Sequence, residues 1–99
     1  MFVKFMTSRQ LLSAYLKTNH PATTVLVIWT DAIDSDAEWD TVKQELAELG
    51  LLLPANFILP GILIIEMPEA IAVNLVNRHN KGGIIMEVYE NGECIHENQ

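Results

Sequence analysis

The sequence predicts an α+β protein whose strands and helices follow one another in the order β-α-β-β-α-β. Two short runs, residues 25–29 and 62–65, are apolar on both faces of the pleat, which is typical of strands at the centre of a sheet. Residues 35–50 and 68–79 repeat apolar side chains at helical spacing. The chain has 99 residues, the usual size of one domain, and shows no repeat, low-complexity tract or linker, so residues 1–99 are predicted to form a single domain.

An additional helix is predicted ahead of the first strand, over residues 8–17. Thr7 and Gln10 have the spacing of a capping box at its start. Pro21 ends it, because the residue before a proline is pushed out of the α region. Residues 1–6 fit either a short strand or the first turns of this helix. The apolar positions of the helix recur at helical spacing: Leu11, Leu12, Tyr15 and Leu16.

The first strand and the helix after it are predicted at residues 23–30 and 35–50. The strand is rich in β-branched and aromatic residues. Ser35 and Glu38 form a second capping-box pattern, and Gly50 is a typical C-terminal stop. The apolar face of this helix comprises Trp39, Val42, Leu46 and Leu49.

The second and third strands are predicted on either side of a turn at Pro60 and Gly61. Residues 51–59 contain Pro54, which cannot donate to a β-ladder, so this run is predicted as an edge strand or an irregular entry to one. Residues 62–67 return beside it as a central strand.

The last part of the chain is predicted as a helix over residues 68–79 and a β-hairpin. The pair Asn91 and Gly92 is a strong hairpin signal, and it joins a strand at residues 84–89 to one at residues 93–97.

This order resembles the ferredoxin-like fold, extended by an N-terminal helix and a C-terminal hairpin. In that fold the first and third strands are central and the second is an edge, which agrees with the apolar runs and with Pro54. Because the central strands are apolar on both faces, the face opposite the two helices needs a cover as well. Either the N-terminal helix or a second subunit fits that role. The competing layout makes residues 2–6 a strand and gives a longer α/β sandwich.

Composition favours self-association and disfavours direct binding to nucleic acid. Apolar residues make up 49% of the chain and charged residues 19%, below the roughly 25% usual for globular domains, so we expect exposed apolar surface or an interface. The net charge of −7 repels a phosphate backbone. It also permits the opposite hypothesis, that the chain is an acidic inhibitor of a nucleic-acid enzyme.

The compartment expected from the sequence is the cytoplasm. The one cysteine, Cys94, cannot form an internal disulfide, which fits a reducing environment. The first residues lack the pattern of a signal peptide, and no apolar run reaches the ~18 residues of a membrane span.

An acidic loop at residues 31–40 is the first candidate binding site. Asp31, Asp34 and Asp36 follow the first strand, a position where ligands commonly bind, and carboxylates at this density can hold a divalent cation or a cationic ligand. The spacing of a calcium loop is met from Asp34 onward, but Trp39 stands where that loop requires glycine. The alternative is that these acids cap the next helix.

The C-terminal half contains two further candidate groups. With a two-residue turn, Tyr89 would lie opposite Cys94 and Glu87 opposite His96, on one face of the hairpin. Cysteine, histidine and glutamate can together bind zinc or form a nucleophile with its base, whereas the alternative is an exposed cross-strand set. The cations Arg78, His79 and Lys81 precede two glycines, but at a helix C-terminus they match the dipole and do not form a phosphate site.

These patterns together predict a small intracellular, non-enzymatic interaction or regulatory module that binds itself or another protein. Leu11, Leu12 and Tyr15 are the predicted interface residues, because they give the first helix two partly apolar sides, one for its own sheet and one for a partner. The alternative is that these side chains simply pack in the core. No catalytic residue and no cofactor are expected. The alternatives are a ligand-binding, metal-binding or enzymatic role for the acidic loop, and the acidic inhibitor.

Overall fold

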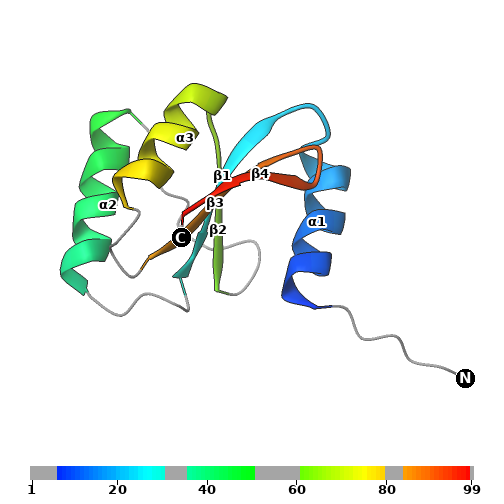
Figure 1. Cartoon of the computed structure of the whole chain (residues 1–99), viewed down its shortest axis with the longest axis horizontal. Coiled ribbons are helices and arrows are strands. Elements are labelled where there is room, and N and C mark those ends of the chain that lie inside the picture. Colours follow the sequence, from blue (N-terminus) through cyan, green and yellow to red (C-terminus); the bar gives the residue numbers. More distant parts are fainter. Residues whose placement is uncertain (1–6, 31–35, 51–60, 80–83, 99) are drawn as a thin grey trace, which may run out of the picture.

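The computed structural model describes residues 7–30, 36–50, 61–79 and 84–98. Within these residues the chain forms three helices and a four-stranded antiparallel sheet of order β2-β1-β3-β4 (Figure 1). The predicted α+β class is therefore confirmed. The elements in chain order are α1 (Ser8–Asn19), β1 (Thr24–Trp29), α2 (Asp36–Glu48), β2 (Ile62–Glu66), α3 (Glu69–Arg78), β3 (Ile85–Glu90) and β4 (Glu93–Glu97).

Helix α1 begins with a complete capping box. The backbone N–H of Gln10 donates to Thr7 Oγ1 at 3.1 Å, and the Thr7 N–H donates to Gln10 Oε1 at 2.8 Å. The helix continues to Asn19, two residues beyond the predicted end, and the N–H of His20 donates to the carbonyl of Leu16 at 2.8 Å. The proline therefore stops the helix, but only after one more half turn.

Strand β1 is one of the two inner strands of the described sheet, since it pairs with β2 on one side and with β3 on the other. The register places Val27 between Ile64 and Glu87, and Trp29 between Ile62 and Ile85. The edge strand predicted at residues 51–59 lies outside the described residues, and so do residues 1–6.

The C-terminal hairpin turns at Asn91 and Gly92, which both have positive φ, 52° and 80°. Two consecutive left-handed residues are the geometry of a type I′ turn, which matches the twist of the strands it joins. Tyr89 lies opposite Cys94 as predicted, but a register shift follows, and Val88 pairs with His96.

The predicted pairing of Glu87 with His96 is therefore wrong. Ile95 is the extra residue of a β-bulge, so Glu87 pairs with Glu97. A bulge changes the parity of a strand, so Cys94 and His96 point to opposite faces of the sheet.

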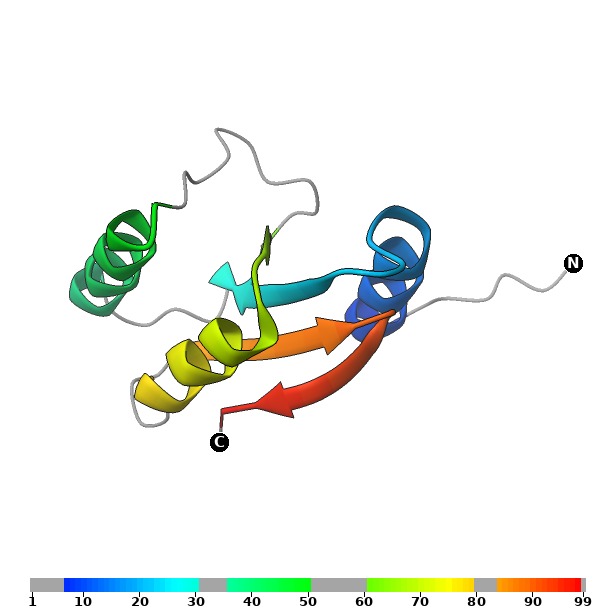
Figure 2. The ribbon, with the colours of Figure 1, turned by 90° about the horizontal axis from the view of Figure 1, so that it is seen from above.

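The sheet is covered on both faces, with α2 and α3 on one side and α1 on the other (Figures 1 and 2). On the α1 side, Leu12 and Leu16 pack against Val25, Val27 and Tyr89. Helix α1 therefore covers the sheet face opposite α2 and α3. The strands that are apolar on both faces predicted a cover at this place. The opposite core comprises Leu26, Ile28, Leu63, Met86 and Val88 of the sheet with Val42, Leu46, Ala72, Leu75 and Val76 of the helices.

In the part of the chain that the structure describes, no helix combines the length and the apolar character needed to cross a membrane.

Candidate functional site

A buried carboxylate, Glu87, lies on the face of the sheet that α1 covers. Only 1% of this residue is exposed, and it is the one buried charged residue in the described part of the chain. Its cross-strand neighbours are Val27 on β1 and Glu97 on β4. The next pair along the same face is Tyr89 with Cys94.

Both carboxylate oxygens of Glu87 accept hydrogen bonds. Arg9 of α1 donates to Oε2 through Nη1, and Trp29 of β1 donates to Oε1 through Nε1. The hydroxyl of Tyr89 also donates to Oε1, at 3.3 Å. A buried carboxylate without partners would cost several kcal/mol, so these donors explain how the charge is tolerated there.

Arg9 extends from the exposed surface of α1 to the buried carboxylate of Glu87. Its side chain is 55% exposed, and its guanidinium lies 5.1 Å from the centroid of the Trp29 ring while it binds Glu87. The cation is therefore held by a carboxylate and an aromatic face together. The hydrogen bond to Glu87 raises the pKa of Arg9 above its ordinary value.

Tyr89 and Cys94, two titratable side chains beside Glu87, are held in their protonated forms. Burial, followed by the charge of Glu87, raises the pKa of Tyr89 to about 12. The same two causes, in the same order, raise the pKa of Cys94. Because only a thiolate is a strong nucleophile or metal ligand, Cys94 is not activated in this arrangement.

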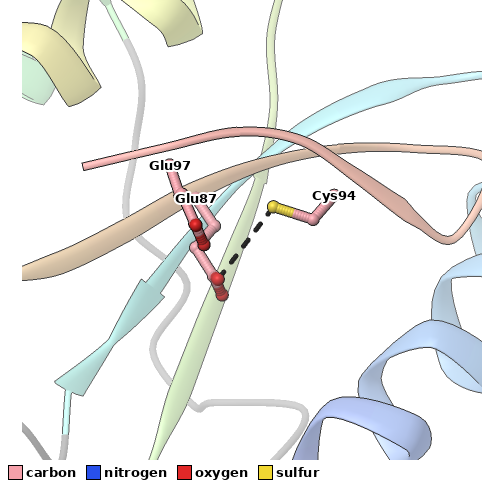
Figure 3. A group of neighbouring side chains, drawn as sticks. All are labelled: Glu87, Cys94 and Glu97. Carbon is pink, nitrogen blue, oxygen red and sulfur yellow. Dashed lines mark hydrogen bonds between the residues drawn. The ribbon is translucent and has the colours of Figure 1, made fainter. Parts of the chain in front are cut away.

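Glu87, Cys94 and Glu97 are the one group of side chains in the described residues that could hold a metal ion together (Figure 3). One donor atom from each lies within 4.8 Å of the others. A cation would have to compete with Arg9 for Glu87 and displace the proton of Cys94. The arrangement therefore fits a structural polar network better than a metal site.

His96 does not join this group. Its Nε2 lies 2.8 Å from Oδ1 of Asn77 on α3, on the opposite side of the sheet. The zinc or nucleophile set considered for Cys94, His96 and Glu87 is thus divided between two faces, because of the bulge at Ile95.

The predicted acidic-loop site falls mainly outside the described residues. Asp31 and Asp34 lie there, so that part of the prediction is not tested. Asp36 is the exposed first residue of α2, where carboxylates match the helix dipole. Asp40 and Glu45, which belong to the calcium-loop spacing, are within the same helix and pair with Lys43 at 3.1 Å and with His79 at 3.0 Å. A helix over these positions cannot wrap an ion as an extended loop does.

The three residues predicted at an interface have different environments. Leu12 is fully buried in the core, whereas Leu11 is 51% exposed. Tyr15 is half-buried, and its ring centroid is 6.0 Å from that of His20. Only Leu11 and part of Tyr15 are therefore available to a partner. Of the basic group, Arg78 is exposed in the last turn of α3, His79 follows the helix, and Lys81 lies outside the described residues.

Sequence reasoning did not find the network of Glu87 with Arg9 and Trp29. The available signal was a single charged residue, Glu87, in the apolar run of residues 84–89. Its partner Arg9 is 78 positions away, so no local pattern links the two.

Comparisons of the chain with protein-family models, curated proteins and solved structures found no match.

Proposed function

We propose that this chain is a small intracellular, non-enzymatic interaction module that associates with itself through apolar surface. One observation carries the proposal: five large apolar side chains in the described residues are more than one third exposed, in a chain of which only 19% is charged. They are Leu11, Leu49, Ile71, Ile85 and Ile95. Covering each of them in an interface contributes roughly 1–2 kcal/mol.

These side chains lie on more than one surface. Leu11 is on α1, and Leu49 and Ile71 belong to the helical layer on the other side of the sheet. Single exposed apolar residues are ordinary on any protein, whereas neighbouring ones are typical of contact sites. The neighbouring pair Leu49 and Ile71 lines one hollow of the surface and is the strongest support for a contact.

The test is the molar mass in solution, measured by light scattering or sedimentation over a wide concentration range. We expect the mass to rise with concentration from that of an 11.1 kDa monomer to that of a dimer. A protein that stays monomeric at the highest concentration would contradict the proposal.

We also infer that the core is ferredoxin-like. Strands β3, β1 and β2 are antiparallel neighbours, as the fourth, first and third strands of that fold are. Residues 51–59 would supply the second strand beside β2, and β4 would be an addition at the opposite edge. Such a fold supports many activities and selects none.

A second proposal is that the acidic loop binds a divalent cation or a cationic ligand through Asp31, Asp34 and Asp36. Thermal unfolding with Ca²⁺, Mg²⁺, Mn²⁺ or Zn²⁺ tests the metal version. Stabilisation that Asp36→Asn reduces would support it, and no stabilisation by any of these ions would exclude it. For the acidic inhibitor, the described acids are divided among α2, β2, α3 and the hairpin, which gives that hypothesis no additional support.

A further inference from the structure

We propose that Asn91 is a site of spontaneous deamidation, and that the docking of α1 on the next residue, Gly92, limits the rate of this reaction. The reaction needs only water, and its product alters the contact between α1 and the C-terminal hairpin. It is independent of the self-association proposed above.

Asn91 is the asparagine whose side chain is most open to attack by its own backbone. It is the one asparagine of the chain that glycine follows. Asparagine is a thermolabile residue, and glycine has no Cβ to shield its nitrogen or to restrict rotation of the peptide group. Asn91 is also exposed to water at the end of the hairpin. Larger side chains follow the other asparagines, which are at positions 19, 56, 74, 77, 80 and 98.

Deamidation begins when the backbone nitrogen of Gly92 attacks Cγ of Asn91. A bond forms between this nitrogen and Cγ, the Cγ–Nδ2 bond breaks, and the amide proton of Gly92 leaves with the side-chain nitrogen as ammonia. The resulting cyclic imide then adds one water molecule. Opening at Cγ gives aspartate, whereas opening at the backbone carbonyl carbon gives isoaspartate, in which the main chain runs through the former side chain.

The native turn holds the two reacting atoms apart. Asn91 and Gly92 have φ values of 52° and 80°, the geometry of a type I′ turn. In such a turn ψ of the first residue is about +30°, as the mirror image of type I. At this ψ the Gly92 nitrogen lies across the Cα–C bond from Cβ of Asn91, so it does not reach Cγ. The attack therefore requires rotation about ψ of Asn91, which opens the turn.

Helix α1 resists this rotation because it packs directly on the turn (Figure 1). The hydroxyl of Ser13 donates to the carbonyl of Gly92 at 2.6 Å. The side chain of Lys17 is so close that a Cβ on Gly92 would lie 2.5 Å from its Cγ. Rotation of the peptide group between residues 91 and 92 displaces Gly92 from both neighbours. The turn therefore opens only when this contact with α1 loosens.

The isoaspartate product changes the same contact permanently. It adds one methylene to the main chain between residues 91 and 92, and a two-residue type I′ loop matches the strands only at its own length. Gly92 must then shift relative to Ser13 and Lys17. Because α1 covers one apolar face of the sheet, deamidation is a one-way chemical change that loosens this cover.

The test measures the rate of deamidation at neutral pH by mass spectrometry. Peptide mapping locates the change of mass from amide to acid, in the native chain and in the chain unfolded in guanidinium chloride. In the unfolded chain, Asn91 is expected to react faster than every other asparagine. In the native chain, Asn91 is expected to react roughly tenfold or more slowly than when unfolded, because the reacting conformation is reached only through opening of the turn.

Ser13→Ala tests the role of α1. Loss of the hydrogen bond to Gly92 should raise the native rate at Asn91 roughly fivefold and leave the rates at the other asparagines unchanged, which separates local opening from global unfolding. The matched control is Thr18→Ala, which removes a hydroxyl of the same helix that donates to the carbonyl of Ala14 at 3.1 Å. This control should leave the native rate at Asn91 unchanged.

The stability of the product tests the consequence. Chain that contains isoaspartate at position 91, separated by chromatography, is expected to unfold at a lower guanidinium concentration than fresh chain. Asn91→Gly keeps a favoured turn sequence but has no amide to lose. This variant, kept under the same conditions, should retain its original unfolding midpoint.

Each part of the proposal has its own contrary result. If Asn91 reacts no faster than the other asparagines in the unfolded chain, the site is wrong. Equal rates in native and unfolded chain would show that the turn does not control the reaction. A native rate that Ser13→Ala leaves unchanged would exclude control by α1, and an isoaspartate chain as stable as fresh chain would exclude the loosening.

Discussion

Arg9 and Glu87 form an ion pair that ties α1 to the centre of the sheet across 78 positions of sequence. Glu87 is buried at its strand position, while the guanidinium of Arg9 reaches it from a side chain that is still half exposed. The pair therefore fixes the helix on the second face and compensates a charge that would otherwise be isolated in an apolar core.

Removal of Arg9 is expected to destabilise the fold by more than an ordinary surface substitution. Arg9→Ala should lower the free energy of unfolding by about 1–3 kcal/mol, because it leaves the buried carboxylate with fewer donors. Urea unfolding at neutral pH measures this. In a double-mutant cycle with Glu87→Gln, the two effects should be less than additive, and strict additivity would show that the residues do not interact.

Gly92 is expected to tolerate no side chain, because α1 packs directly over it. A Cβ at this position would lie 2.5 Å from Cγ of Lys17 and 2.9 Å from the carbonyl oxygen of Ser13, and the residue has a φ of +80°. Gly92→Ala should therefore destabilise the protein by more than the roughly 1–2 kcal/mol that a left-handed residue alone costs. The matched control is Gly50→Ala, with a φ of +79° and open space around its Cβ. Equal effects of the two substitutions in urea unfolding would contradict the close packing of α1 on the turn.

The raised pKa of Tyr89 predicts that the protein loses stability in alkali. Burial and the charge of Glu87 raise its pKa from 10.0 to about 12, so the folded chain holds the phenol proton more tightly than the unfolded chain does. The resulting stability is fully present below pH 10 and disappears as the pH rises toward about 12. Circular dichroism across this range should show a smaller loss for Tyr89→Phe than for the original chain. Phenolate absorbance from Tyr89 that develops near pH 10 would refute the shift.

The pair of His79 with Glu45 is expected to contribute more to stability than an exposed ion pair within α2. The first pair joins the residue that follows α3 to α2 at 3.0 Å and is mostly buried, with side chains 11% and 21% exposed. His79→Ala should cost about 1 kcal/mol and increase hydrogen exchange in α2. Lys43→Ala, which removes the exposed Asp40 pair, should change stability by less than about 0.5 kcal/mol. The reverse ranking in urea unfolding would mean that the interhelical link is unimportant.

Elements with strong local signals were predicted well from sequence. The capping box of Thr7 and Gln10 forms as its spacing indicates, and Asn91 and Gly92 form the turn that their tolerance of positive φ favours. The β-branched run forms β1, an inner strand of the described sheet. In each case the deciding sequence signal lies within a few residues of the chain.

Features that depend on long-range packing were not predicted. The bulge at Ile95 has no glycine or proline to mark it, and by moving His96 to the face of Asn77 it divides the expected metal set. The role of Leu12 was uncertain because a helical stripe does not show which of its sides meets the sheet, and Leu12 proved to be fully buried. The Arg9–Glu87 pair depends on a fold that brings the two ends of the chain together.

The attachment of α1 has a consequence for the order in which the protein folds. The helix is synthesised before the sheet, yet it docks on the C-terminal hairpin, through Arg9 with Glu87 and through Ser13, whose hydroxyl donates to the carbonyl of Gly92 at 2.6 Å. These contacts close a loop of nearly the whole chain, which is a slow event in folding. During translation the helix must wait for the hairpin, and one apolar face of the sheet stays open to chaperones or to another nascent chain until then.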